Sequence, residues 1–204
     1  MSERFLDKAY GARDADETRK LYDDWAASYE AELGEHGYAT PGRCSAALAQ
    51  YAADKSRPVL DFGCGTGLSG LALRLAGFET IDGLDVSADM LAQAKGKSVY
   101  RDLRQIEPGQ DLGHKPGDYA AIAAIGVIGA GAAPISVFDT IMRGLAKSGL
   151  FVFSFNDHAL QEPQYEARVM EWTDCGAARL LFVKHGDHIP GIGLKAKVYV
   201  LEKN

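Results

Sequence analysis

The sequence predicts a doubly wound α/β fold, in which helices cover both faces of a mostly parallel sheet. Over residues 58–155, short apolar runs alternate with segments of helical periodicity, which is typical of parallel strands joined by right-handed crossovers. The first apolar run stops abruptly at a glycine-rich turn. The last two runs alternate apolar and polar residues, as an antiparallel hairpin does at a sheet edge. Together these observations predict seven strands, with N-terminal helices covering the sheet.

The chain has 204 residues, of which 47% are hydrophobic and 25% charged, and this composition is typical of one globular domain. We expect a single domain over residues 1–204, with an N-terminal helical cap in 1–57 and the sheet in 58–204. The formal net charge of -6 argues against nucleic acid as a partner, because such binding relies on Lys and Arg neutralising phosphates.

Three widely spaced cysteines suggest neither a disulfide framework nor a metal site, which favours a reducing, cytoplasmic compartment. The first 20 residues are rich in charge and lack the apolar stretch of a secretory signal. Residues 119–138 carry no charge, but their glycines and Pro134 indicate a strand, a loop and a helix. We therefore expect no membrane span.

Bulky side chains at every fourth position predict a helix over residues 18–33, which Gly34 and Gly37 end, and a second helix follows over 42–53. The apolar runs predict core strands at 58–62, 79–84, 98–103, 118–128 and 149–155. Helical spacing predicts helices at 68–75, 88–94, 135–146 and 162–172. The hairpin strands are expected at 177–185 and 194–201.

The glycine-rich turn reads DFGCGTG over residues 61–67, directly after the first predicted strand. Glycines at alternate positions allow a ligand to approach the backbone closely, where a side chain would collide with it. The spacing departs from the dinucleotide fingerprint, because Leu68 stands where that pattern has its third glycine. No lysine follows the glycines as a phosphate-binding P-loop requires.

Two acidic residues flank this turn in the predicted sheet. Asp61 precedes the glycines at the end of its strand, where it can orient the turn or receive an ammonium group through water. Asp85 ends the second strand, where a carboxylate can accept hydrogen bonds from both hydroxyls of a ribose. The pair indicates an adenosine ligand; the alternative is a tight turn with an incidental solvent-facing Asp85.

With these motifs the chain resembles the class I S-adenosylmethionine-dependent methyltransferases over nearly its whole length. DFGCGTG resembles their motif I, and LDVSADMLAQA resembles the acidic segment and helix that follow it. The resemblance implies a Rossmann-like fold and S-adenosyl-L-methionine as cofactor. It implies that the cofactor-binding residues of the core are Asp61, Gly63, Cys64, Gly65, Thr66, Gly67, Asp85, Val86, Met90, Asp102, Leu103, Gly126 and Val127.

In that family the glycine turn lies against the methionine part of the cofactor, and the residue matching Asp85 holds the ribose. The positions of Val86 and Met90 pack on the adenine, and YRDL places Asp102 and Leu103 at the adenine amino group and ring edge. AIGVIG, with Gly126 and Val127, falls where the fourth strand opens toward the reacting centre. Cys64 is interpreted as structural.

The segment LYDDWAASYE, followed by this core and KSVYRDL, is similar to the Williams-Beuren syndrome chromosome region 27 methyltransferase-like proteins. This similarity implies that the N-terminal helix closes over the cofactor and places Tyr22, Trp25 and Tyr29 near its methionine end. The alternative is that these aromatic side chains only pack the covering helix. We expect Tyr29 and Val127 near the transferred methyl group.

Methyl transfer from a sulfonium is an in-line displacement, so alignment and exclusion of water are the main tasks of the protein. His158 and His36 are the candidate bases for an acceptor that must lose a proton, although for each the sequence favours the alternative of a solvated loop histidine. Asn156 and Asp157 could suggest a metal-dependent methyltransferase of the catechol type. No further carboxylate with a clear spacing supports that type, and no metal is predicted.

The segment GVIGAGAAP lacks the Pro-Pro-Tyr and Pro-Cys signatures of many DNA methyltransferases, which favours a small-molecule methyl acceptor. Two alternatives remain open at this point. One is a module that binds the cofactor or its product without catalysis, and the other is a nicotinamide-dependent oxidoreductase. The sequence identifies neither the acceptor, the methylated atom nor the oligomeric state.

Overall fold

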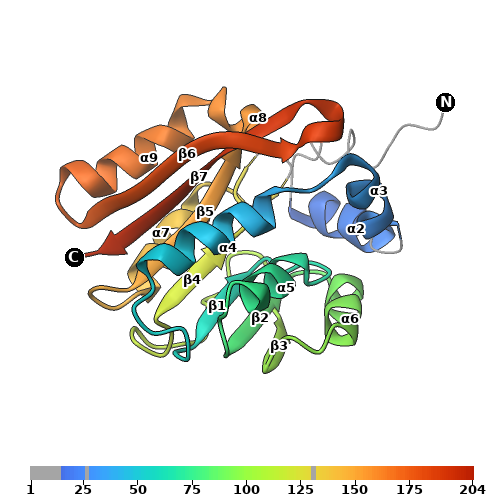
Figure 1. Ribbon diagram of the computed structural model, residues 1–204, viewed down its shortest axis with the longest axis horizontal. Helices are drawn as coiled ribbons and strands as arrows, with labels where there is room; N and C mark the ends of the chain where they lie inside the picture. Colours follow the sequence, from blue (N-terminus) through green and yellow to red (C-terminus); the bar gives the residue numbers. More distant parts are fainter. Residues whose placement is uncertain (1–14, 26–27, 130–131) are drawn as a thin grey trace.

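The computed structural model describes residues 15–25, 28–129 and 132–204 and shows a seven-stranded sheet (Figure 1). The strand order is β3-β2-β1-β4-β5-β7-β6, in which β1 to β5 are parallel and β6 and β7 form an antiparallel edge hairpin. The fold class predicted from the sequence is therefore confirmed. The strands are β1 Val59–Phe62, β2 Ile81–Asp85, β3 Asp102–Gln105, β4 Ala121–Ala124, β5 Leu150–Asn156, β6 Ala178–Ile189 and β7 Leu194–Lys203.

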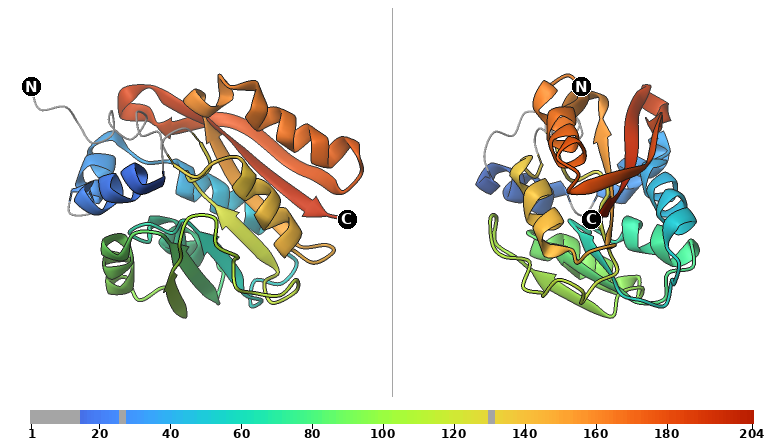
Figure 2. Two further views of the ribbon diagram at one scale, coloured as in Figure 1. Left: turned by 180° about the vertical axis from the view of Figure 1, so that it is seen from behind. Right: turned by 90° about the vertical axis from the view of Figure 1, so that its left-hand side faces the viewer.

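Helices lie on both faces of this sheet (Figure 2). One face is covered by α4 and α5, the other by α7 and α9, while α6 packs beside β2 and β3. The elements are α2 Ala15–Trp25, α3 Tyr29–His36, α4 Thr40–Tyr51, α5 Leu68–Leu75, α6 Ala88–Gly96, α7 Ser136–Gly144, α8 Asp157–Leu160, α9 Pro163–Asp174 and the 3₁₀ turn η1 Pro190–Ile192.

The two faces have separate apolar cores. On the α7 face, the Phe138 ring packs edge-on against Phe151 and Phe153, with ring centroids 5.3 and 5.2 Å apart. On the α4 face, Leu48 and Leu73 are fully buried. Because the central strands are covered on both sides, β1, β2 and β4 are buried at every residue, and polar groups reach solvent only at the strand ends.

The N-terminal helix differs from its prediction. Instead of one helix over residues 18–33, the chain forms α2, which ends at Trp25, and α3, which begins at Tyr29, and the Ser28 amide donates to the Trp25 carbonyl at 3.0 Å. Gly34 lies inside α3, and Gly37, with φ of 74°, ends it. Helical spacing alone did not reveal this break; Trp25, the last residue of α2, is buried in one apolar cluster with the distant Ile189.

Several strands begin or end away from their predicted limits: β6 continues past the expected end at 185 to Ile189, and two strands beside the site also differ. The strand expected at 98–103 pairs with β2 only from Asp102 onward, because Ser98 turns the chain with φ of 53°. The strand expected at 118–128 ends at Ala124, because Gly126 adopts φ of 71°. Because β3 starts later and β4 ends earlier than predicted, different residues stand at the carboxyl edge of the sheet, where the site lies.

None of the helices in the described ranges is long and apolar enough to span a membrane. The cytoplasmic location remains a prediction. So does the division of a single domain at residue 57, although α4 already belongs to the layer that packs on the sheet.

Candidate active site

A cavity of about 250 Å³ opens at the carboxyl ends of β1, β2 and β4. Eight of the residues predicted from the sequence line it: Tyr29, Gly63, Gly65, Asp85, Val86, Met90, Gly126 and Val127. A smaller cavity of about 30 Å³ adjoins it, sharing Tyr29, Gly63, Gly65 and Ile125 and adding Cys64 and Thr66. The fold therefore gathers residues from the cap, the glycine turn and two further strand ends at one edge.

The glycine turn is tied to the neighbouring strand by its backbone. The amides of Gly63 and Cys64 both donate to the Leu84 carbonyl, at 2.8 and 3.0 Å. Gly63 has φ of 68°, and a Cβ atom there would lie 2.5 Å from the Val127 side chain. Only glycine at this position lets Val127 close over the turn.

Asp85 lies at the junction of the turn and the second strand. Its two carboxylate oxygens accept hydrogen bonds from the amides of Gly65, at 2.7 Å, and Ser87, at 2.9 Å. Burial raises the pKa of this carboxyl group, while these backbone hydrogen bonds oppose the rise. The backbone thus fixes the orientation of an acidic group that faces the cavity.

Asp61 lies behind the turn and is fully buried. One carboxylate oxygen accepts hydrogen bonds from the hydroxyls of Ser69, at 2.6 Å, and Tyr100, at 2.7 Å. The other oxygen, Oδ1, is buried with no hydrogen-bond partner among the described residues. Burial raises the pKa of this carboxyl group to about 7, and the two hydroxyls oppose the rise.

Several predicted residues line neither cavity. Trp25 is buried in the cap and packs edge-on against Tyr29, with ring centroids 4.7 Å apart. Gly67 lies at the start of α5 with φ of 94°, close to Ala94 and to the side chain of Tyr100. Tyr22 falls in α2, but its side chain lies outside the described residues.

The positions around β3 are shifted from the prediction. Asp102 and Leu103 begin this strand instead of ending it, and the exposed Asp102 pairs with Arg104 at 3.4 Å. The cavity wall is reached by Ile106 and Glu107, which follow the strand. Because a parallel strand presents only its carboxyl end to the site, the late start of β3 accounts for the shift.

Another part of the wall was missed because it comes from loops and from α7, where the sequence carries no motif. The loop after β4 and the start of α7 contribute mostly apolar side chains. These wall residues are Ala132, Ala133, Pro134, Ser136, Val137 and Thr140. The only available signal was the rule that ligands bind at the carboxyl edge, which points to these loops without selecting residues.

The candidate bases lie elsewhere. His158 is exposed in α8, and His36 ends α3 beside Gly191; neither lines either of the two cavities described above. Within the described ranges, no three His, Cys, Asp or Glu side chains form a group that could hold a metal ion. Burial raises the pKa of the Cys64 thiol well above its ordinary value, which supports a structural interpretation of this residue.

The cap is joined to the rim of the site by polar contacts. Arg19 pairs with Glu107, Glu30 with Lys97, and the Ser87 hydroxyl donates to Asp23. Each contact links α2 or α3 to a segment beside the cavity. The cap therefore rests on the same loops that form the wall.

Comparison with known proteins agrees with this geometry. Residues 36–192 match a family model described as a methyltransferase domain. Methyltransferase-like protein 27 of Homo sapiens is 32% identical over 136 residues, which cover 65% of this chain and 56% of that protein. The 18S rRNA (guanine(1575)-N(7))-methyltransferase of Saccharomyces cerevisiae is 30% identical over 125 residues, which cover 54% of this chain and 46% of that protein. The chain thus spans about half the length of these two relatives.

Among solved structures, the chain is similar to the magnesium protoporphyrin IX methyltransferase of Synechocystis PCC 6803 with bound SAM. The TM-score is 0.61 at 15% identity, covering 98% of this chain and 90% of that one, which concerns the fold alone. The family model covers well over half of the chain. The resemblance drawn from the glycine turn is therefore confirmed: the chain belongs to the class I S-adenosylmethionine-dependent methyltransferases and is similar to methyltransferase-like protein 27.

Proposed function

We propose that this chain binds S-adenosyl-L-methionine along the carboxyl edge of the sheet and catalyses methyl transfer to a small, largely apolar molecule. The observation that carries this proposal is the meeting of the glycine turn and Asp85 on one wall of the 250 Å³ cavity. The cofactor-bound relative with the same fold and the family assignment support it.

The residues present fit such a cofactor. At Gly65, with φ of 52°, an added Cβ would meet nothing within 4 Å, so the backbone of the turn is open to a ligand. Thr66 Oγ1 and Asp61 Oδ1 are buried without a hydrogen-bond partner among the described residues. Buried polar atoms of this kind need partners, and an amino-acid group bound at the turn can supply them directly or through water.

Asp85 is suited to hold a ribose. Each carboxylate oxygen can accept about two hydrogen bonds, and the backbone of Gly65 and Ser87 occupies one site on each. The remaining sites can accept hydrogen bonds from two neighbouring hydroxyls. Since the backbone already fixes the carboxylate, binding costs little side-chain entropy.

An adenine ring would lie beyond Asp85, between the apolar side chains of Val86, Met90 and Ile106. Met90 and Ile106 are almost fully buried; Met90 lies in the first turn of α6, while Val86 and Ile106 directly follow β2 and β3. An apolar slot of this kind binds a flat aromatic base by burying its faces.

When bound, the cofactor supplies an activated methyl group on a sulfonium with a neutral leaving group. The chain aligns the reactants and excludes water from the cavity, and the cap with Tyr29 forms part of this enclosure. The acceptor would contact the wall formed by Val127, Pro134 and Val137. That wall is mostly apolar, and it supports a small apolar acceptor.

The first test is calorimetric titration with S-adenosylmethionine, S-adenosylhomocysteine and NADH. We expect both sulfur nucleosides to bind and NADH not to bind. Tight binding of NADH alone would support the nicotinamide-dependent alternative and contradict the proposal.

The second test separates the acceptor classes, because the yeast relative is named for its action on 18S rRNA. The chain is incubated with methyl-labelled cofactor and either a low-molecular-weight metabolite extract or total RNA. We expect label in the metabolite fraction. Label confined to RNA would refute the small-molecule acceptor, and cofactor binding without any product would favour a non-catalytic binding module.

A further inference from the structure

The β6–β7 hairpin extends beyond the sheet and reaches the cap. The pairing of β5 with β7 ends at Asn156 and Ala196, whereas the pairing of β6 with β7 continues to Ile189 and Leu194. The tip of the hairpin lies beside α3 in Figure 1, and Gly191 packs against the backbone of His36. Residues near the C-terminus thereby contact the N-terminal helices.

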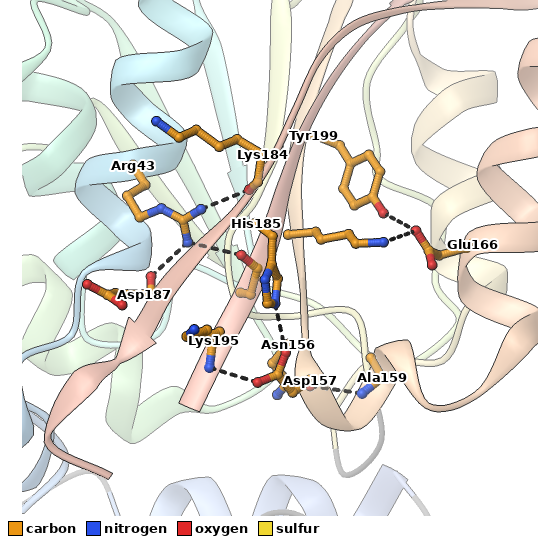
Figure 3. A network of polar contacts seen from close by, with 12 residues as sticks. Arg43, Asn156, Asp157, Ala159, Glu166, Lys184, His185, Asp187, Lys195 and Tyr199 are labelled. Carbon is orange, nitrogen blue, oxygen red and sulfur yellow. Dashed lines mark hydrogen bonds and ion pairs between the residues drawn. The ribbon is translucent and has the colours of Figure 1, made fainter. Parts of the chain in front are cut away.

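This extension is held from two sides (Figure 3). From α4, the Arg43 guanidinium donates to the carbonyls of Asp187, at 2.7 Å, Lys184, at 2.8 Å, and Ala196, at 3.1 Å. From the start of α8, Asp157 accepts from the Lys195 amide at 3.0 Å and contacts His185 at 2.9 Å. These contacts therefore hold the two strands of the hairpin in place just before its tip.

His188 lies near the end of β6, points toward the cap and is only 5% exposed. Its Nδ1 atom lies 2.7 Å from the Thr40 hydroxyl, and its carbonyl accepts from the Ala39 amide at 2.9 Å. Its ring meets the Tyr38 ring edge-on, with centroids 5.3 Å apart and an interplanar angle of 89°. Burial, with Arg43 nearby, lowers the pKa of His188 to about 4, so the imidazole is neutral near pH 7.

Tyr38 connects this contact to the site. Its hydroxyl lies so close to Gly126 that a Cβ atom at Gly126 would overlap it. Tyr38 also lines the small cavity together with Gly63 and Thr66. A volume of about 30 Å³ accepts only a small group, such as the ammonium or carboxylate of an amino acid.

We infer that Tyr38 binds the amino-acid end of the cofactor and that His188 is a positioning residue, which holds the Tyr38 ring in place from the hairpin tip. This inference rests on the proposed function. The C-terminal hairpin then serves the site through Tyr38, although none of its own residues lines either cavity.

The test compares two ligands, S-adenosylhomocysteine and 5′-methylthioadenosine, the second of which lacks the amino-acid end. Tyr38→Phe removes one hydroxyl and should weaken S-adenosylhomocysteine binding about tenfold, while methylthioadenosine binding stays within about twofold of wild type. His188→Ala should weaken the first ligand about threefold, again sparing the second. The double variant should bind no more weakly than Tyr38→Phe alone, because His188 acts through Tyr38.

A matched control is available within the chain. His114 meets Tyr119 in the same edge-on geometry, with centroids 5.1 Å apart and an angle of 86°, and neither residue lines either of the two described cavities. His114→Ala should lower thermal stability but leave the ratio of the two ligand affinities unchanged. In His188→Phe, which retains a ring against Tyr38, that ratio should return toward wild type.

The outcomes distinguish the inference from the proposed function. If wild type binds neither nucleoside, both fail. If wild type binds both but Tyr38→Phe weakens them equally or not at all, the role of Tyr38 is refuted and the proposed function stands. If His188→Ala leaves the affinity ratio unchanged in a folded protein, the positioning role is refuted.

Discussion

Two regions border the site and are held together differently. The glycine-turn region comprises residues 61–69 and Asp85, and the cap-hairpin region comprises α2, α3, residues 37–43 and the hairpin residues 184–196. In the turn, partners are close in sequence: Gly65 and Asp85 are 20 positions apart, and Asp61 and Ser69 only 8. In the cap-hairpin region, Thr40 and His188 are 148 positions apart. These hydrogen bonds of the turn lie within one strand-helix-strand unit, whereas the contact between Thr40 and His188 joins the two ends of the fold.

The regions also differ in what stabilises them. Around the turn, Asp61 and Thr66 are almost fully buried, in a part of the sheet covered on both faces. The cap relies on a small apolar cluster, in which Trp25, Leu33 and Ile189 are buried, and on partly exposed ion pairs. Exposed ion pairs contribute about 0–1 kcal/mol each. We therefore expect local unfolding of the cap to require less free energy than local unfolding of the glycine turn.

The largest expected effect is at Gly63. Gly63→Ala should lower the free energy of unfolding by about 3 kcal/mol, because the new methyl group collides with Val127 and the residue keeps a positive φ. Gly176→Ala is the matched control, since Gly176 has φ of 75° but an added Cβ meets nothing within 4 Å. It should lose only about 1 kcal/mol. Equal losses in urea unfolding would show that the contact with Val127 is unimportant.

The next effect concerns ligand binding at the turn. Asp85→Ala should weaken S-adenosylhomocysteine binding about 100-fold by calorimetry, because it removes a charged acceptor that faces the cavity. Asp82→Ala is the control from the same strand: Asp82 is buried, but it bonds Arg101 and Tyr119 outside the cavity. That variant should lose stability and retain affinity. A similar loss of affinity in both would mean that Asp85 acts only through the fold.

The third prediction addresses the cap-hairpin region. Arg43→Ala leaves three hairpin carbonyls without their donor and should cost about 2 kcal/mol of stability. Hydrogen exchange should accelerate over residues 187–195 but not over 63–85. Arg179→Ala, which breaks an exposed pair with Glu202 in the same hairpin, should cost less than about 0.5 kcal/mol. Faster exchange at the glycine turn would show that the two regions unfold together.

The smallest effect is a pH dependence of stability from Asp61. Burial raises its pKa from 3.8 to about 7, so between these values the folded chain binds a proton more tightly than the unfolded chain. The stabilisation is thus fully present below pH 3.8 and is lost as pH rises toward about 7. Between pH 5 and 6, wild type should lose about 1 kcal/mol relative to Asp61→Asn. Parallel stability curves for the two proteins would show that Asp61 does not titrate in this range.

The sequence determined the fold class and pointed to the glycine turn as one part of the candidate site. The alternation of apolar runs with segments of helical periodicity predicted the parallel sheet. The spacing of apolar residues along a strand or a helix follows from the geometry of that element and from the face that it buries. Asp61, Gly63, Gly65 and Asp85 could be singled out because they stand at the ends of two predicted strands.

Only the tertiary structure decided the rest of the wall. The register of β3, which brings Ile106 rather than Asp102 to the cavity, depends on where the chain begins to pair with β2. The apolar cluster that Trp25 shares with Ile189 and the contact of Tyr38 with His188 depend on a hairpin more than a hundred positions away. Such contacts form only when the chain collapses around a common core, and no local pattern of residue types records them.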